Sequence, residues 1–189
     1  PRAQRIMTSS SSSSSTSSSS TGVDFFSAMI GNELWTATAP SSGSRNASIR
    51  VYDPTGARAF VLTPRTPVFP DPSISYGLIT SGAKIPSQPD LVFLGHSNGY
   101  ISTWSSETFT CLKTQRISPS SITALASGIE NSLWVGFKTG YIGVYKIVGD
   151  RWTVTKMWKA HKDSVTMMMV DYASLDEVSQ LHSSYWNED

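Results

Sequence analysis

The sequence has 189 residues and a formal net charge of +1, a balance that gives no case for a nucleic-acid partner. No apolar run approaches the roughly 18 residues that a membrane-spanning helix needs. The single cysteine, Cys111, excludes an internal disulfide and a cysteine-rich metal site, and it fits a reducing compartment. Charged residues make up only 15% of the chain beside 13 glycines and 10 prolines, which is typical of short strands joined by turns. We therefore expect a cytoplasmic all-β protein that binds no nucleic acid.

The first 22 residues differ in composition from the rest of the chain. From Ser9 to Thr21 there is only serine and threonine, which offer no apolar surface to bury. We expect residues 1–22 to be disordered and the folded part to cover residues 23–172. No apolar core of a secretory signal precedes the folded part. Because the chain starts with Pro1 instead of methionine, we expect it to be a fragment of a longer protein.

A repeat organises the folded part. Residues 91–105 and 133–146 align at a constant offset of 41 residues. The aligned positions are Phe93 and Trp134, Gly95 and Gly136, Gly99 and Gly140, and the closing aromatics Trp104 and Tyr145. A third copy lies upstream between Trp35 and Tyr52, and its hairpin loop is six residues longer. A longer surface loop costs little closure entropy, so we treat the three passages as one repeated unit.

Each unit is predicted to be a β-hairpin flanked by an inner and an outer strand. The first unit has predicted strands at residues 25–31, 34–37, 48–53 and 57–63. The second has an inner strand at 77–82, a hairpin at 91–105 and an outer strand at 109–114, and the third has the same elements at 121–127, 133–146 and 151–158. Asn98-Gly99 suits a tight turn because both residues tolerate positive φ. Thr139 before Gly140 is a poorer choice by the same rule.

Four strands per unit at a period near 41 residues indicate the blades of a β-propeller. A fourth unit begins at residues 160–172 as a loop followed by an inner strand, with Val165 placed 43 residues after Ile122. Residues 173–189 lack the repeat and are predicted to be an irregular tail. The predicted fold is a partial propeller of three four-stranded blades plus one strand.

The repeat resembles that of WD-repeat proteins in a degenerate form. His161 follows Trp158 and stands a few residues before the predicted inner strand, where WD-repeat proteins place the histidine of their Gly-His pair. The resemblance implies a structural histidine that holds turns through buried hydrogen bonds. Of the three hairpins, only the first, at residues 51–53, resembles the Trp-Asp ending of the family.

No catalytic, cofactor-binding or metal-ligating residue is predicted. The three histidines, His96, His161 and His182, do not have the spacing of metal ligands, and Cys111 is not expected to be a nucleophile. Basic residues gather late in the chain at Lys138, Lys146, Arg151, Lys156, Lys159 and Lys162. They are either the solvated edges of strands or a weak patch for an anionic membrane or an acidic partner.

A more specific resemblance covers residues 25–171 and is best over residues 132–170. The strand Leu133-Trp134-Val135-Gly136, the turn before Tyr141, Trp152 and residues 158–161 resemble the end of the WD-repeat region that precedes the catalytic domain in large fungal inositol-polyphosphate 5-phosphatases. The resemblance implies a parent with a Mg-dependent phosphatase domain. The motifs of that domain, Gly-Asp-x-Asn-x-Arg and Pro-x-Trp-x-Asp-Arg, do not occur in the 189 residues. This chain is therefore not expected to be the catalyst.

Two hypotheses about function remain at this point. The chain is either a non-catalytic interaction or targeting module of a phosphoinositide 5-phosphatase, or a stand-alone WD-repeat scaffold, and both predict protein partners. A partial ring also has two uncovered ends. We expect the first unit, with Phe25, Trp35 and Tyr52, and the last strand, at residues 165–170, to leave apolar surface exposed and to promote association.

Overall fold

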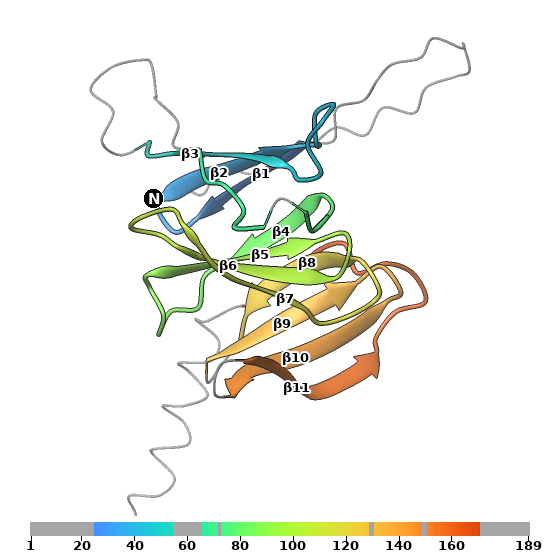
Figure 1. Ribbon diagram of the computed structural model, residues 1–189. Coiled ribbons are helices and arrows are strands. Elements are labelled where there is room, and N and C mark those ends of the chain that lie inside the picture. Colours follow the sequence, from blue (N-terminus) through green and yellow to red (C-terminus); the bar gives the residue numbers. More distant parts are fainter. Residues whose placement is uncertain (1–24, 55–65, 72, 129–130, 149–150, 171–189) are drawn as a thin grey trace, which may run out of the picture.

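The strands of the protein form three antiparallel sheets, which follow one another from top to bottom in Figure 1. The structure, a computed structural model, describes residues 25–54, 66–71, 73–128, 131–148 and 151–170. The first sheet contains β1 (Phe25–Ile30), β2 (Glu33–Thr38) and β3 (Ser48–Tyr52). The second contains β4 (Ile79–Ala83), β5 (Leu91–His96), β6 (Tyr100–Ser105) and β7 (Cys111–Arg116). The third contains β8 (Ile122–Ser127), β9 (Ser132–Phe137), β10 (Tyr141–Val148) and β11 (Arg151–Lys159).

Each sheet is a meander in which consecutive strands pair, in the orders β1-β2-β3, β4-β5-β6-β7 and β11-β10-β9-β8. The all-β prediction is therefore confirmed. The predicted fourth strand of the first unit, residues 57–63, lies outside the described residues. So do the segments 1–22 and 173–189, for which disorder and an irregular tail were predicted.

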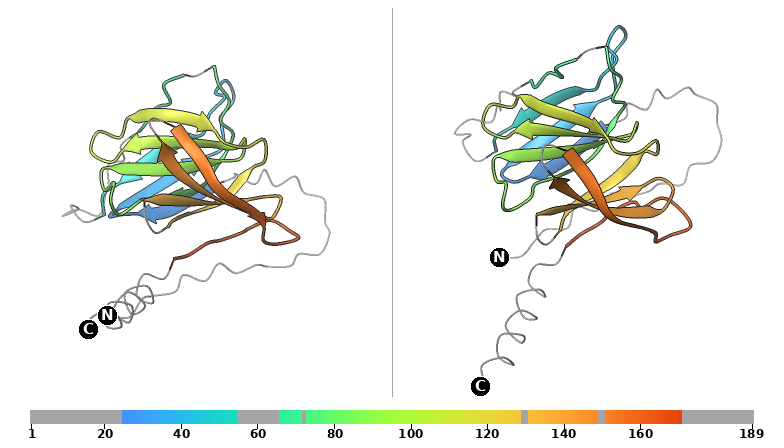
Figure 2. Two further views of the ribbon diagram at one scale, coloured as in Figure 1. Left: turned by 90° about the horizontal axis from the view of Figure 1, so that it is seen from below. Right: turned by 60° about the horizontal axis from the view of Figure 1, so that its bottom comes forward.

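Figure 2 shows the three sheets from two further directions. The sheets contact one another mainly through their first strands, β1, β4 and β8. Thr80 of β4 donates a hydrogen bond of 2.7 Å from its hydroxyl to the carbonyl of Ile122 in β8. The side chain of Ile30 in β1 packs over Gly82 of β4 in the space that a Cβ atom there would need. These contacts place β1, β4 and β8 side by side, which is the arrangement of neighbouring propeller blades.

Two apolar clusters lie between the sheets. The first, between the first and second sheets, includes Trp35 and Trp104, whose ring centroids are 6.3 Å apart. The second lies between the second and third sheets and includes Phe93 and Trp152, with centroids 5.2 Å apart. All four side chains are buried. Each buried aromatic contributes roughly 1.5–3 kcal/mol, so the stacking of sheets is a main source of stability.

The hairpin turns differ from the predicted turn type. The N–H of Gly99 donates to the carbonyl of His96, and the N–H of Gly140 donates to that of Phe137. Only the glycines have positive φ, 77° for Gly99 and 79° for Gly140, so the residue before each glycine needs no special conformation. Thr139 is therefore not a poorer choice than asparagine, and that expectation is wrong.

The predicted strand of the fourth unit is also wrong. Residues 160–170 form no strand after β11, because a strand needs a neighbour to complete its ladder and the described residues supply none beyond this segment. Val165 is nevertheless buried. Its N–H donates to the carbonyl of Phe137, and its own carbonyl accepts from the hydroxyl of Thr123.

Candidate interaction surface

The aligned aromatic of each unit points toward the following sheet. Trp35 of the first sheet and Phe93 of the second are both fully covered. Trp35 is covered by a cluster that includes Trp104, and Phe93 is covered by a cluster that includes Trp152 and Tyr145. The expectation that Trp35 lies on an uncovered face is therefore wrong, because its side chain faces inward.

The equivalent residue of the third sheet, Trp134, is only half-buried because no described sheet follows it. Strand pairing places four further side chains around it: Val144 lies opposite both Trp134 and Lys156, and Ile142 lies opposite Trp158. Cross-strand partners lie on the same face. We call Trp134, Ile142, Val144, Lys156 and Trp158 the open face.

The open face is largely aromatic and aliphatic and carries a cation. The rings of Trp134 and Trp158 meet edge to face at a centroid distance of 5.8 Å. The Nζ of Lys156 lies 5.4 Å from the centroid of Trp158, within range of a cation–π interaction. The face therefore suits a partner surface that brings apolar side chains and tolerates a positive charge.

The segment after β11 is fastened to the edge of this face. The N–H groups of Ala160 and His161 both donate to the carbonyl of Gly140 at 3.1 Å. The side chain of Val165 fills the space that a Cβ atom on Gly136 would need. His161 is exposed, so the prediction that its side chain makes buried hydrogen bonds is wrong; its backbone makes the contact instead.

The predicted basic residues lie on different parts of the third sheet. Lys156 belongs to the open face, whereas Lys159 pairs with Tyr141 on the opposite face of the sheet and donates to the carbonyl of Thr139. The remaining four are Lys138 in the β9–β10 turn, Lys146 in β10, Arg151 at the start of β11 and Lys162 in the following loop. Since β11 has nine residues, its ends lie roughly 27 Å apart at about 3.4 Å per residue. The six cations are therefore distributed around the third sheet.

A buried polar chain in the second sheet was missed by the sequence analysis. The Nε2 of His96 lies 2.7 Å from the hydroxyl of Ser102, and the indole N–H of Trp104 donates to that hydroxyl at 2.8 Å. All three residues are buried, and burial lowers the pKa of His96 to about 3. The neutral imidazole can then accept the hydroxyl hydrogen. The inward alternation of Val92, Leu94 and His96 is the sequence signal that could have placed this histidine inside.

The next titratable groups of the structure are Cys111 and the side-chain types that can bind a metal ion. Burial raises the pKa of Cys111 to about 11, so its thiol stays protonated and is a poor nucleophile. Among the residues with described positions, no three His, Cys, Asp or Glu side chains gather as a metal site. None of these residues forms a helix long and apolar enough to cross a membrane.

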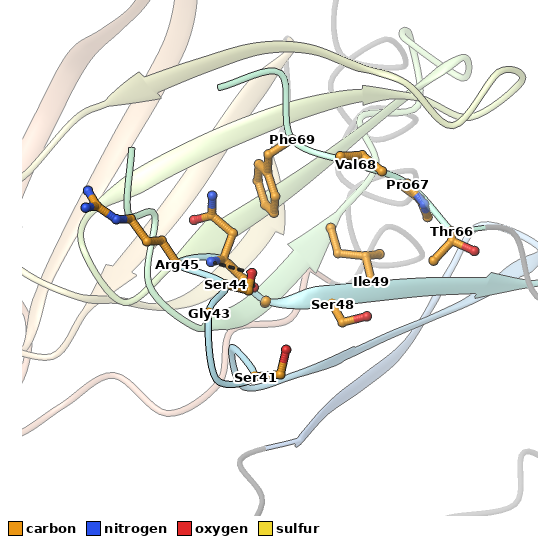
Figure 3. Close-up of a pocket in the computed structure, with 12 residues that line it drawn as sticks. Ser41, Gly43, Ser44, Arg45, Ser48, Ile49, Thr66, Pro67, Val68 and Phe69 are labelled. Atoms are coloured by element: carbon orange, nitrogen blue, oxygen red, sulfur yellow. Dashed lines mark hydrogen bonds between the residues drawn. The ribbon is translucent and has the colours of Figure 1, made fainter. Parts of the chain in front are cut away.

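A cavity of about 470 Å³ lies between the long β2–β3 loop and residues 66–69 (Figure 3). The guanidinium of Arg45 is directed away from Pro67 and Val68 and donates to the carbonyl of Ser73 at 3.0 Å. Ser44 donates to the carbonyl of Asn46. Arg45 thus fastens the loop to residue 73, and Ser44 stabilises the loop internally.

Comparisons with known proteins give one curated relative and several structures of similar fold. No protein-family model matches the chain. A probable inositol polyphosphate 5-phosphatase of Schizosaccharomyces pombe is 35% identical over 144 residues, which cover 71% of this chain and 12% of that protein. The chain thus spans a small part of the relative's length.

Two solved structures match the fold. The computationally designed protein Ika8 matches with a TM-score of 0.52 and 21% identity over 77% of this chain and 39% of its own. U3-55K matches with a TM-score of 0.52 and 16% identity over 72% of this chain and 38% of its own. The prediction of a partial propeller of the WD-repeat type is confirmed, and the chain is similar to one region of a fungal 5-phosphatase.

Proposed function

We propose that the chain is a non-catalytic WD-repeat-like interaction and targeting module of an inositol polyphosphate or phosphoinositide 5-phosphatase, acting in the cytoplasm. The observation that carries the proposal is the 35% identity over 144 residues to the S. pombe protein. The matched stretch is only 12% of that relative, so phosphatase activity is assigned to the longer parent and not to these residues. A propeller offers many exposed loops, which suits protein partners.

The chemistry of the described residues supports a non-catalytic role. The 189 residues contain neither phosphatase motif. His96 is held neutral in the core, and the Cys111 thiol stays protonated. General acid–base catalysis needs a group whose pKa lies near the working pH and that reaches substrate, and neither residue meets both requirements.

The edge strand β11 is the surface that best fits an acidic protein partner. It presents Val154 and Met157, which are 47% and 46% exposed, on the same face as Lys159, and Lys156 on the other face of the strand. An edge strand also leaves backbone donors and acceptors unpaired on its outer side. Apolar contact, backbone pairing and positive charge together favour an acidic segment that binds in an extended form. The same lysines give a weak contact with anionic membranes as a secondary role.

A domain exchange tests targeting separately from catalysis. In the S. pombe relative, the matched 144 residues would be replaced by residues 25–170 of this chain, or deleted. We expect both proteins to hydrolyse a soluble inositol polyphosphate in Mg²⁺ at similar rates, and only the exchanged protein to keep the distribution of the parent in cells.

Two outcomes would contradict the proposal. If the deletion abolished turnover of the soluble substrate while the protein stayed folded, the region would be part of the catalytic apparatus. If the exchanged protein lost the distribution of the parent as fully as the deletion, the chain would be a stand-alone scaffold. The isolated chain should release no phosphate above a blank from either substrate class.

A further inference from the structure

The outer edge of β11 already pairs with one group from the neighbouring sheet. The side-chain amide of Gln115 in β7 donates to the carbonyl of Trp152 at 2.9 Å and accepts from the backbone N–H of Trp152 at 2.8 Å. Both backbone groups of Trp152 therefore point away from its partner on β10, Ile147, because the N–H and carbonyl of one strand residue point to the same side. This edge thus presents backbone groups in the geometry of a β-ladder.

The next position on the same edge is open among the described residues. Pairing between β10 and β11 is regular from Trp152 to Val154, so the N–H and carbonyl of Val154 also point outward. In the described part of the chain, β11 is the end strand of its sheet, and residues 153–157 are all exposed. An added strand can therefore begin to pair at Val154, whereas Gln115 occupies the position before it.

An exposed apolar strip runs along the free part of β11. Val154 and Met157 are 47% and 46% exposed and lie on the face of the third sheet that also carries Tyr145 and Lys159. Tyr145 belongs to the cluster between the second and third sheets, so this is the face toward the second sheet. Tyr141, opposite Lys159, is 40% exposed on the same face. The strip is therefore separate from the open face.

Three of the six cations of the third sheet gather where this strip reaches the β9–β10 turn. The Nζ of Lys159 donates to the carbonyl of Thr139 in that turn. Lys138 is the preceding residue and is exposed. Residues 161–163 lie against the turn glycine, which brings the exposed Lys162 to the same place. Positive charge is thus concentrated at one end of the strip.

The charge around the strip is one-sided. Residues 131–148 and 151–170 contain six lysines and arginines and a single acid, Asp163. Carboxylates of a partner would therefore meet several cations and one like charge at the turn, and complementary charge of this kind favours binding and fixes register.

From these observations we infer that the outer edge of β11 is an addition site for an extended acidic segment of a partner protein. The segment pairs with β11 from Val154 onward, places an apolar side chain against Val154 and Met157, and carries carboxylates beside Lys138, Lys159 and Lys162. The inference rests on the proposed role of the chain as an interaction module, and it specifies the chemistry and the register of the partner.

Peptide selection tests the chemistry of the partner. The full 189-residue chain is immobilised and presented with a random peptide display library, and enriched peptides are synthesised with a fluorophore for anisotropy titrations. We expect these peptides to combine β-forming residues with Asp or Glu at one end. Lys159→Glu should weaken their binding roughly fivefold, because an attraction is replaced by a repulsion. The matched control Arg151→Glu makes the same charge change at the other end of β11 and should weaken binding less than about twofold.

Amide hydrogen exchange tests the pairing itself. In the free chain the outward N–H of Val154 should exchange quickly, and the N–H of Thr153, which points to β10, should exchange slowly. A selected peptide at saturation should slow exchange at Val154 at least roughly tenfold and leave Thr153 unchanged. Val154→Pro removes the outward N–H at a position where edge strands tolerate proline, and it should weaken binding roughly fivefold. If that variant does not fold, the exchange measurement on the unmodified chain decides.

Two results would overturn the inference. The first is a selection that enriches no peptide with a preference for the unmodified chain over Lys159→Glu; if phosphatidylserine vesicles then bind the unmodified chain alone, the lysines serve a membrane. The second is a selected peptide that leaves exchange at Val154 unchanged. Neither measurement involves a phosphatase domain. Failure here therefore leaves the domain exchange in the S. pombe relative unaffected, and failure of that exchange leaves the peptide site in place.

Discussion

The two ends of the stack differ in chemistry although both lack a neighbouring sheet among the described residues. The outer face of the first sheet carries Thr36, Thr38 and Arg50 among four large side chains, Phe25, Met29, Leu34 and Tyr52, and Phe25 and Met29 are 63% and 57% exposed. The open face of the third sheet carries two tryptophans, an isoleucine and a valine beside Lys156, and Lys146 lies farther along the same face. Water solvates threonine and arginine readily but not a continuous apolar surface. Polar residues therefore interrupt the apolar surface of the first end, whereas the two tryptophans of the third end contact each other and form a more continuous apolar surface that is suited to be covered.

The difference persists when equivalent positions are compared. Thr36 and Thr38 of the first sheet align with Leu94 and His96 of the second and with Val135 and Phe137 of the third. The last four are buried between sheets, while the two threonines are half-exposed. The three sheets thus share the same strand arrangement, but the side chains at these equivalent positions are mostly apolar where the face is covered by another sheet and polar where it is not.

The largest expected effect compares one repeat position in two settings. Trp104 is fully buried, and its equivalent Tyr52 lies half-exposed on the outer face of the first sheet. We expect Trp104→Ala to lower the free energy of unfolding by about 3–5 kcal/mol and Tyr52→Ala to lower it by less than about 1 kcal/mol. Urea unfolding followed by circular dichroism measures both. Equal losses would show that the outer face of the first sheet is also packed.

The next effect concerns the turn glycines, which lie against the segment that follows the last strand of their own sheet: Gly99 lies against Ser118 and Gly140 against His161. Gly99→Ala forces an alanine to φ 77° and drives its Cβ into the carbonyl of Ser118. We expect a loss of more than about 2 kcal/mol, since strained backbone costs about 1–3 kcal/mol before any clash. Gly43 has φ 92° but no neighbour within 4 Å of a Cβ atom, so Gly43→Ala should cost only about 1–2 kcal/mol. If the two variants unfold at the same urea concentration, the contact with the following segment does not constrain the turn.

A smaller effect is the pH dependence of stability, which we expect to come from the buried His96 and not from the exposed His161. The pKa of folded His96 is about 3 against 6.5 for the unfolded chain, so below pH 6.5 the unfolded chain binds the proton first. The stabilising contribution is complete above that pH and is lost as the pH falls toward 3. Between pH 7 and 5 we expect a loss of about 2 kcal/mol. His96→Phe, which copies Phe137 of the third sheet, should remove this dependence, and His161→Gln should leave it unchanged. A pH dependence that survives in His96→Phe would assign it to other groups.

The repeat could be predicted from the sequence because each unit has a local signal, a turn glycine between two runs of β-forming residues. The β-forming runs on both sides of Gly99 and Gly140 and the constant offset between Phe93 and Trp134 needed no tertiary information. The strand predictions at residues 25–31 and 151–158 agree with β1 and β11 to within one residue. The outer strand predicted at residues 109–114 begins two residues before β7, because Phe109 has a positive φ of 58° that excludes it from a strand.

The remaining errors come from contacts between sheets, which single residues do not reveal. Trp35 was expected to be uncovered because periodicity gives two faces of a strand but not which face meets a neighbour. The strand at residues 165–170 was expected from β-forming residues, but pairing depends on a further sheet. His161 was matched to a family position, whereas the buried histidine of the structure is His96, inside a strand.

The central claim is that the open face of the third sheet, and not the outer face of the first sheet, drives self-association. The most direct test compares variants of the two faces. Sedimentation velocity over a concentration series would compare the chain with two matched double variants, Trp134→Thr with Trp158→Thr on the third sheet and Phe25→Thr with Met29→Thr on the first. We predict graded self-association of the unmodified chain, a marked reduction in the third-sheet variant, and little change in the first-sheet variant. Association that is relieved only by the first-sheet variant, or equally by both, would contradict the account.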